Sequence, residues 1–487
     1  MKLKQSLYIG AGFTQAQYPW VIPIIHGFCC EKKINNLIFE KYPETFILKN
    51  DILKNILSKY NIINLSKILP FWYKIKFIKY LILLLPSIFL FLNFNKKKIL
   101  DKNQSWYNTQ VFHSIWDTAL VYGKNNSKPK ARAVYLFISC ISILESIFLA
   151  NILIKKNVTY FFLNHCVYKF RAFLAVIRKN NLNIISQAAY NFHLQENKFD
   201  TSFSVLNNKI LFLLKRRIQK NLILNYWKRR TKGRGYYDLS NHVFTGKINK
   251  KIKIPQNVIF LHIFQDSPYN VIDKNRIFVD YIDWFLITLN IIKQSNESWI
   301  IRIHPGSSRW GENLKFFIKN EIKKTKANNI ILLESDISNN QIFKIAKRII
   351  TFSGTSHLEA ACFGIKPIII QSTQLDCFNK NYVLKPRSIS EYNRLLIKSS
   401  NSKIFQLPAR AIFGSKFLLF VREKVLTLRE DLKQIDIYRS DKKLISAKNI
   451  NNLFNNLPKN LSSLELNGRN LAKGYTHTFS KKYLNIL

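Results

Sequence analysis

The sequence predicts an α/β fold built from two domains, each with a largely parallel sheet, and three observations lead to this prediction. Apolar strands alternate with short helices throughout the region after about residue 256. Those strands are almost continuously apolar, as strands are when helices cover both faces of a parallel sheet. A second β-α-β pattern lies before residue 190, and 487 residues exceed the size at which one core usually stops growing.

The second half has the clearer pattern and is predicted to be a Rossmann-like domain. Its first helix, 277–294, places Ile277, Trp284 and Leu289 at helical spacing. The other expected helices are 313–324, 340–347 and 356–363. The expected strands are 258–262, 299–303, 329–334, 348–352 and 366–371.

The first half is predicted to be a second α/β domain that carries a helical insertion. Two apolar strands, 159–165 and 182–187, enclose the helix 168–179. Helical segments are expected around 70–100 and 131–153, and further strands at 5–13 and 35–41. A polar, lysine-rich stretch at 239–257 separates the halves. We therefore predict an α/β domain with a helical insertion at 1–245, a Rossmann-like domain at 246–440 and a tail at 441–487.

The charge is large, at a formal +48, but it is spread along the whole chain. Lysine, isoleucine and asparagine are abundant even in predicted loops, a pattern that a compositional bias of the genome explains. The charge favours anionic lipid and phosphorylated ligands more than a nucleic-acid groove, which needs a continuous basic surface with interleaved aromatic residues. The six cysteines are scattered without a C-x-x-C pair, so we expect a reducing cytoplasmic setting and no metal site.

The apolar segment 80–94 has lysines on both sides. It is shorter than the roughly 20 residues that a membrane-spanning helix needs, and Pro86 is expected to interrupt it. Its apolar residues are distributed all round the predicted helix. Two interpretations stay open: a buried hairpin of core helices, or a shallow insertion into the membrane surface with lysines at lipid phosphates.

Polar residues follow nearly every strand of the second half. Ligands of open parallel sheets bind outside the carboxyl ends of the strands, so this convergence is the strongest functional signal in the chain. The polar segments are 262–266, 304–305, 334–336, 353–356 and 371–372.

His304 and Pro305 directly follow a strand. Proline cannot continue the hydrogen-bond ladder, so the chain must turn there and hold the histidine at the sheet edge. An imidazole in that place can donate to a diphosphate oxygen or neutralise the charge of a leaving group.

The segment Ser353, Gly354, Thr355 and Ser356 lies between a strand and a helix. The first turn of a helix offers free N–H groups and the positive end of the helix dipole to an anion. Gly354 lets the backbone approach a ligand closely, and the three hydroxyls can donate to phosphate oxygens. This turn is therefore a candidate phosphate site.

A structural interpretation of the same segment is a helix cap. Ser356 and Glu359 match the S-x-x-E capping box, and Gly364 is placed to end the helix. Both interpretations are compatible, because a capped helix still presents its first turn.

The order H-P, an acidic strand end and then S-G-T-x-x-x-E-A-x-x-x-G-x-x-P-I resembles the donor domain of bacterial capsule polysaccharide biosynthesis glycosyltransferases. This group is similar to the transferases of 3-deoxy-manno-octulosonic acid and to CDP-glycerol glycerophosphotransferases. The resemblance covers residues 256–375 and implies two facing Rossmann-like domains, the GT-B arrangement. It also implies that His304, Ser353, Thr355 and Ser356 hold a nucleotide-sugar donor, that Glu359 contacts its ribose or sugar, and that no cofactor or obligatory metal is needed.

The resemblance implies an inverting transferase, which usually takes its catalytic base from the N-terminal domain, facing the donor across the cleft. Three residues are candidates: Asp117, His165 just beyond a strand, and Asp266 on the donor side. For Asp117 a helix cap or a surface charge is an equal alternative.

The resulting expectation is a glycosyltransferase that moves a sugar onto a surface-polysaccharide or lipid-linked glycan acceptor. The alternatives are a CDP-alcohol phosphotransferase of the teichoic-acid type, a UDP-sugar 2-epimerase and, from a different class, a basic nucleic-acid-binding protein. Because segments 74–98 and 215–234 combine apolar surface with many cations, we expect a peripheral protein at the inner, anionic face of the cytoplasmic membrane.

Overall fold

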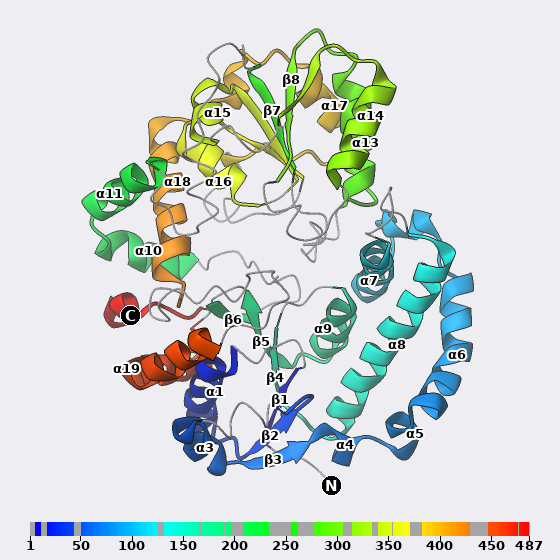
Figure 1. Ribbon diagram of the computed structural model, residues 1–487, viewed down its shortest axis with the longest axis vertical. Helices are drawn as coiled ribbons and strands as arrows, with labels where there is room; N and C mark the ends of the chain where they lie inside the picture. Colours follow the sequence, from blue (N-terminus) through cyan, green and yellow to red (C-terminus); the bar gives the residue numbers. More distant parts are fainter. Residues whose placement is uncertain are drawn as a thin grey trace.

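The computed structural model contains two α/β domains, each built around its own sheet (Figure 1). The prediction of two Rossmann-like domains in the GT-B arrangement is confirmed. The residues that the structure describes are 5–10, 17–42, 50–123, 131–164, 168–188, 191–195, 208–232, 255–261, 276–304, 314–333, 339–352, 354–370, 382–428, 447–475 and 477–486.

The first sheet has the strand order β3-β2-β1-β4-β5-β6. All neighbouring pairs are parallel except β5 and β6. This is the Rossmann order, in which the chain reverses direction across the sheet between β1 and β4. The strands are β1 (Ser6–Ile9), β2 (Asn36–Phe39), β3 (Asn61–Asn64), β4 (Tyr160–Leu163), β5 (Asn183–Ala188) and β6 (Asn191–Gln195).

The second sheet has the order β11-β10-β7-β8-β9, and all its pairs are parallel. Counted from its own first strand this is again the Rossmann order, with the reversal between β7 and β10. The strands are β7 (Asn257–Phe260), β8 (Trp299–Arg302), β9 (Ile330–Leu333), β10 (Arg348–Thr351) and β11 (Ile368–Ile369).

A helical insertion separates β3 from β4, as the sequence predicts. Its longest member is α8 (Ala133–Lys155), which packs against α6, α7 and the sheet helix α9 (Lys169–Lys179). Pro86 does not interrupt α6, which runs unbroken from Lys76 to Leu92. The remaining helices of this domain are α1 (Tyr18–Lys32), α3 (Asp51–Ser58), α4 (Leu65–Ile68), α5 (Phe71–Lys74), η2 (Lys96–Ile99) and α7 (Trp106–Tyr122).

Two helices of the second domain begin at a side-chain cap, and the first of them begins at Tyr281, four residues later than expected. Asp280 caps α13 by accepting from the Asp283 N–H, and Ser388 caps α17 by accepting from the Glu391 N–H. The helices are α13 (Tyr281–Ile292), α14 (Leu314–Thr325), α15 (Asn339–Ile345), α16 (Ser356–Cys362), α17 (Ile389–Ile397), η7 (Lys403–Phe405) and α18 (Ala409–Phe420), followed by the π-helix η8 (Val421–Val425).

The segments before and after the second domain pack differently from what the expected domain limits imply. Helices α10 (Asn208–Arg217) and α11 (Lys220–Thr231), placed by the sequence in the first domain, share a hydrophobic core with α16 and α18. Helix α19 (Ala447–Ala472), followed by η9 (Lys481–Ile486), was expected to be a tail but packs along α1 in the first domain (Figure 1). The apolar positions Leu457, Leu464 and Leu471 explain this, because they repeat at seven-residue intervals and form one buried stripe.

Candidate active site at the two sheet edges

The carboxyl edge of the second sheet brings two predicted segments together. In the ladder, Thr351 of β10 pairs with Phe260 of β7, which pairs with Arg302 of β8. His304 and Gly354 therefore leave the same edge on either side of the end of β7. With strands about 4.8 Å apart, these two exits are separated by roughly 10 Å. The edge lies at the β7–β10 reversal, where open α/β sheets bind their ligands.

The turn after β10 has a backbone conformation that suits glycine. Gly354 has a φ of 97°, in the left-handed region. Its carbonyl oxygen accepts a hydrogen bond from Nδ1 of His357, which fixes the proton on that nitrogen. Burial lowers the pKa of His357 to about 3, so the ring is neutral near pH 7. His357 thus holds the turn, a role that its single position in the sequence does not reveal.

The hydroxyls of the turn remain accessible at the start of α16. Thr355 and Ser356 are partly exposed, and the Ser356 hydroxyl lies 3.4 Å from that of Thr351 on β10. His304 on the neighbouring side is partly exposed as well. The edge therefore offers hydroxyl and imidazole donors suited to phosphate oxygens.

The predicted capping box is wrong, although the predicted helix end is confirmed. The N-cap of α16 is Thr355 and makes no side-chain cap hydrogen bond, while Glu359 is turned to a different partner. At the other end Gly364 has a φ of 91°. Its N–H donates to the carbonyl oxygen of Ala361, and the N–H of Ile365 donates to that of Ala360. This pair of bonds is a Schellman motif, which needs glycine at that position.

Glu359 lies in a buried ionic cluster. Its Oε1 accepts from Nη2 of Arg230 on α11 at 2.5 Å, and the other guanidinium nitrogen donates to Glu423. Tyr226 also donates to Glu423. Burial raises the pKa of Glu359 while Arg230 opposes the rise. The carboxylate that the resemblance assigns to the donor's ribose or sugar thus fastens α11 to α16 directly behind the turn.

Asp117, the first candidate base, is buried between two arginines. Its Oδ2 lies 3.0 Å from Nη1 of Arg171 and 2.7 Å from Nη2 of Arg276. Arg171 belongs to the first domain and Arg276 to the second, and the adjacent Trp116 donates to Asp280 across the same junction. The geometry favours a structural ion pair between domains, because both carboxylate oxygens already accept from guanidinium groups.

Four other predicted site residues cannot be placed. His165, Asp266, Pro305 and Ser353 lie outside the residues that the structure describes. Their assignment as catalytic or donor-binding residues stays a prediction. Within the described part of the chain no group of three or more His, Cys, Asp or Glu side chains is arranged to hold a metal ion.

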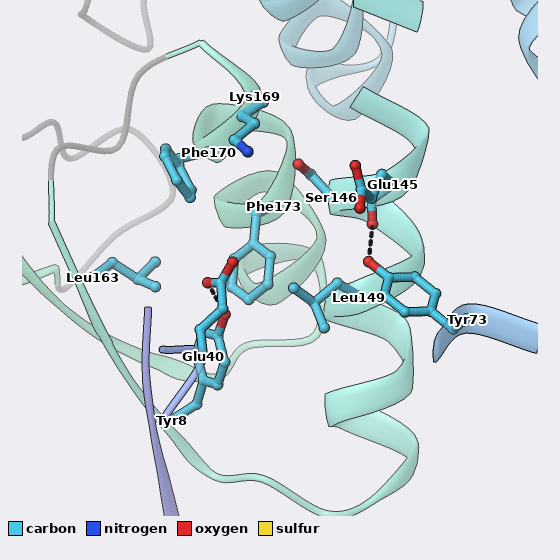
Figure 2. A pocket seen from close by; sticks show the side chains of 10 residues that line it. All are labelled: Tyr8, Glu40, Tyr73, Glu145, Ser146, Leu149, Leu163, Lys169, Phe170 and Phe173. Carbon is cyan, nitrogen blue, oxygen red and sulfur yellow. Dashed lines mark hydrogen bonds between the residues drawn. The ribbon is translucent and has the colours of Figure 1, made fainter. Parts of the chain in front are cut away.

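The carboxyl edge of the first sheet contains a pocket that the sequence did not predict (Figure 2). Glu40, directly after β2, and Leu163, the last residue of β4, line it at the β1–β4 reversal. A motif search misses Glu40, although its place after an apolar strand is the signal that identified His304. The full lining is Tyr8, Glu40, Tyr73, Glu145, Ser146, Leu149, Leu163, Lys169, Phe170 and Phe173.

The pocket combines carboxylates with aromatic rings. The Tyr8 hydroxyl donates to Glu40, and burial together with Glu40 raises the pKa of Tyr8 well above its ordinary value. Glu145 accepts from Lys79 at 2.5 Å. Figure 2 shows Tyr8 of β1, Glu40 after β2 and Glu145 of α8 around the pocket. Lys169, Phe170 and Phe173 enter it from α9, and the ring of Phe173 stacks on that of Tyr8. Two carboxylates beside apolar ring faces suit a ligand that presents both hydroxyl donors and C–H surfaces.

Comparisons of the whole chain find remote structural likenesses. No family model matches the sequence, and no curated protein matches it either. Among solved structures, the UDP-GlcNAc 2-epimerase of Methanocaldococcus jannaschii with UDP-GlcNAc and UDP is 15% identical, with a TM-score of 0.27, covering 87% of this chain and 99% of the other. Anabaena Alr3699/HepE with UDP and glucose is 9% identical, with a TM-score of 0.29, covering 94% and 100%. The UDP-GlcNAc 2-epimerase of Neisseria meningitidis bound to UDP-GlcNAc is 11% identical, with a TM-score of 0.25, covering 86% and 98%. We therefore base the function on this chain's own residues.

Proposed function

We propose that the protein is a glycosyltransferase that uses a nucleotide-activated sugar and an acceptor from surface-polysaccharide synthesis. One observation carries the proposal: each Rossmann-like sheet places ligand-binding groups at its own reversal point, and the two sets differ in chemistry. The second edge carries donors for an anion, whereas the first carries carboxylates and aromatic rings. A transferase needs this division, because its two substrates bind separately.

The donor's diphosphate is assigned to the edge formed by His304 and the turn at Gly354. The hydroxyls of Thr355 and Ser356 and the first N–H groups of α16 bind phosphate oxygens. His304, roughly two strand spacings away, donates to the leaving diphosphate as negative charge develops on it. This assignment agrees with the sequence resemblance and requires no metal.

The acceptor's reacting sugar is assigned to the pocket beside Glu40. Carboxylates accept hydrogen bonds from sugar hydroxyls, and the partly exposed ring of Phe170 packs against sugar C–H groups. Because Asp117 is held between Arg171 and Arg276, Glu40 replaces it as our first choice for the residue that contacts the attacking hydroxyl.

Product analysis distinguishes this function from its rivals. The full chain is incubated with UDP-, CDP-, GDP- and ADP-sugars and with CDP-glycerol, with and without a glycan-lipid extract, and the products are separated by chromatography. Transfer releases a free nucleoside diphosphate only when the acceptor is present. Release of CMP from CDP-glycerol indicates a phosphotransferase, and conversion of a UDP-sugar to its C2 epimer without acceptor indicates an epimerase. Either of those results contradicts the proposal.

Glu40→Gln tests the assignment of the acceptor pocket. The substitution keeps the shape and the acceptance of a hydrogen bond from Tyr8 but removes the charge. We expect transfer to fall by roughly 10²-fold, the range of acid–base and positioning groups, while nucleotide binding stays unchanged. Asp51→Asn, at an exposed carboxylate on α3, is the matched control. Full transfer by Glu40→Gln would remove this carboxylate from the site.

A further inference from the structure

Helix α6 exposes an apolar face to solvent. Phe77, Leu85, Phe89 and Leu92 are 74, 75, 71 and 73% exposed, and Leu81 lies between them on the same side. Their spacing of three, four or seven residues places them on one stripe. Figure 1 shows α6 at the outer edge of the first domain, with α8 between it and the rest of that domain.

The opposite side of α6 is fastened to α8. Helix α6 contacts α8 along its length, and its Leu83 and Ser87 are buried. Lys79 pairs with Glu145, and the rings of Phe91 and Phe137 meet edge to face at 5.8 Å. The helix is therefore held rigidly with its apolar stripe outward. This arrangement contradicts the interpretation of segment 80–94 as a buried hairpin. Although the helix has apolar residues all round, only one of its sides is exposed to solvent.

The charged side chains that the segment containing α6 contributes are all lysines. The chain between Asp51 and Asp101 contains nine lysines and no aspartate or glutamate. Lys74 and Lys76 are exposed at the start of α6, and Lys96 and Lys97 are exposed just beyond its end. The apolar stripe thus has cations at both ends, a pattern complementary to an acyl layer bordered by anionic headgroups.

We propose that the face of α6 formed by Phe77, Leu81, Leu85, Phe89 and Leu92 lies in the surface of an anionic lipid bilayer. A helix of 17 residues is about 26 Å long, shorter than the roughly 30 Å hydrocarbon core, and one side of it packs on protein. It therefore lies along the surface and does not span the bilayer. Val134 and Ile138 of α8 are also exposed, beside the end of α6 that contains Phe91.

The neighbouring helix α8 is the one described helix long and apolar enough to cross a membrane by length and composition, with a mean hydropathy of 2.2 over 18 residues. In the structure it contacts α6, α7 and α9, and Cys140, Ile143 and Leu153 are buried in two core clusters. We therefore assign α8 to the support of the membrane-facing surface and α6 to the surface itself. The proposal does not depend on the glycosyltransferase function.

Vesicle binding tests the proposal with the full-length protein. The chain is sedimented with vesicles of equal parts phosphatidylglycerol and phosphatidylcholine, and with vesicles of phosphatidylcholine alone. We expect binding to the anionic vesicles that weakens as salt is raised, because screening shortens the reach of the lysines. Phe89→Glu should weaken it by roughly tenfold or more, since a charge then enters the apolar layer.

Matched variants distinguish binding through this surface from non-specific adsorption of the protein to vesicles. Phe316→Glu changes a phenylalanine of the second domain that is 58% exposed, and it should bind as the parent does. Lys96→Glu with Lys97→Glu should also weaken binding, whereas Lys323→Glu with Lys403→Glu should not. Three results would overturn the proposal. The first is that the parent fails to bind vesicles, and the second is that Phe89→Glu and Phe316→Glu lose vesicle binding equally. The third is that the protein does not bind lipid but forms a dimer that Phe89→Glu dissociates.

Discussion

At the scale of single residues, the conformation of the donor-side turn depends on a neutral, buried histidine. Nδ1 of His357 donates to the carbonyl of Gly354, and burial lowers the ring's pKa to about 3. In the unfolded chain the same ring has a pKa near 6.5. Protonation therefore favours the unfolded chain, so this contribution is complete above pH 6.5 and is lost progressively as the pH falls toward 3.

We predict that His357→Gln makes the protein less sensitive to acid. Between about pH 6.5 and 5 the parent loses roughly 2 kcal/mol through this one group, at about 1.4 kcal/mol per pH unit. The variant lacks that loss, although it is less stable than the parent near pH 7. Urea unfolding of both proteins near pH 7 and pH 5 checks the difference. An equal change in the two proteins would show that the ring is accessible to protons in the folded state.

His304→Ala is predicted to slow transfer by roughly 10²-fold or more, as when one donor to a developing negative charge is removed. The unfolding midpoint should change little, because His304 is partly exposed. Initial rates with a saturating donor, together with a melting curve, measure both. Transfer at the parental rate would exclude His304 from the mechanism.

Sequence reasoning identified residues whose signal is local and missed those whose role depends on partners far along the chain. His304 and Gly354 lie two and three residues beyond the ends of their strands, and Gly364 ends a helix, so position alone identified them. Glu359 fitted a local capping pattern, yet its partner is Arg230, 129 residues away. The pairing of Asp117 with Arg276 spans 159 residues. No local pattern contains such a pairing.

At the scale of elements, helices α1 and α19 approach closely because both carry glycine at the contact. A Cβ added to Gly27 would lie 1.9 Å from the carbonyl oxygen of Glu465, and one added to Gly468 would lie 2.0 Å from that of Ile24. Both obstacles are backbone atoms, which cannot rotate away. The seam between these helices therefore has no room for a side chain at either position.

Gly468→Ala is predicted to destabilise the protein by at least 1–3 kcal/mol, the usual cost of overpacking, because the helices must separate. Gly474→Ala is the control, since its added Cβ meets nothing within 4 Å and only its φ of 95° is unfavourable; it should cost about 1 kcal/mol. Denaturant unfolding measures both. Equal losses would show that the helices adjust freely at this contact.

Most strands and helices of the second domain were predictable because they are apolar, regularly spaced and bounded by polar turns. Helix α19 was not, because its asparagine-rich sequence hides a buried stripe of leucines. Strand β3 (Asn61–Asn64) was also missed. It has only one buried position, Ile63, and at four residues it is too short for an alternating pattern to be recognised.

At the scale of the whole molecule, the chain exchanges elements between its domains. Helices α10 and α11 leave the first half to pack on the second domain, while α19 returns to the first. The sequence pattern indicated two α/β units, but the limits between them were predicted from composition alone. Composition does not report on packing partners, so both crossings were missed.

Asp117 joins the two domains, and Asp117→Asn is predicted to cost about 3 kcal/mol or more, because it leaves two buried guanidinium groups without their counter-charge. Denaturant unfolding monitored by tryptophan fluorescence measures the loss. A variant with parental stability and no transfer activity would instead identify Asp117 as the catalytic base.

The central claim, a nucleotide diphosphate bound at the β7–β10 reversal, is tested most directly by calorimetric titration of Ser356→Asp. A carboxylate in the first turn of α16 repels phosphate yet favours the helix dipole, so the fold should be retained. Ser388→Asp makes the same change at the start of α17 and serves as the control. With UDP, CDP, GDP and ADP as titrants, we predict that the parent and Ser388→Asp bind at least one nucleotide with similar affinity, and that Ser356→Asp binds it at least tenfold more weakly. Equal affinity in all three proteins, or no binding of any nucleotide by the parent, would contradict the claim.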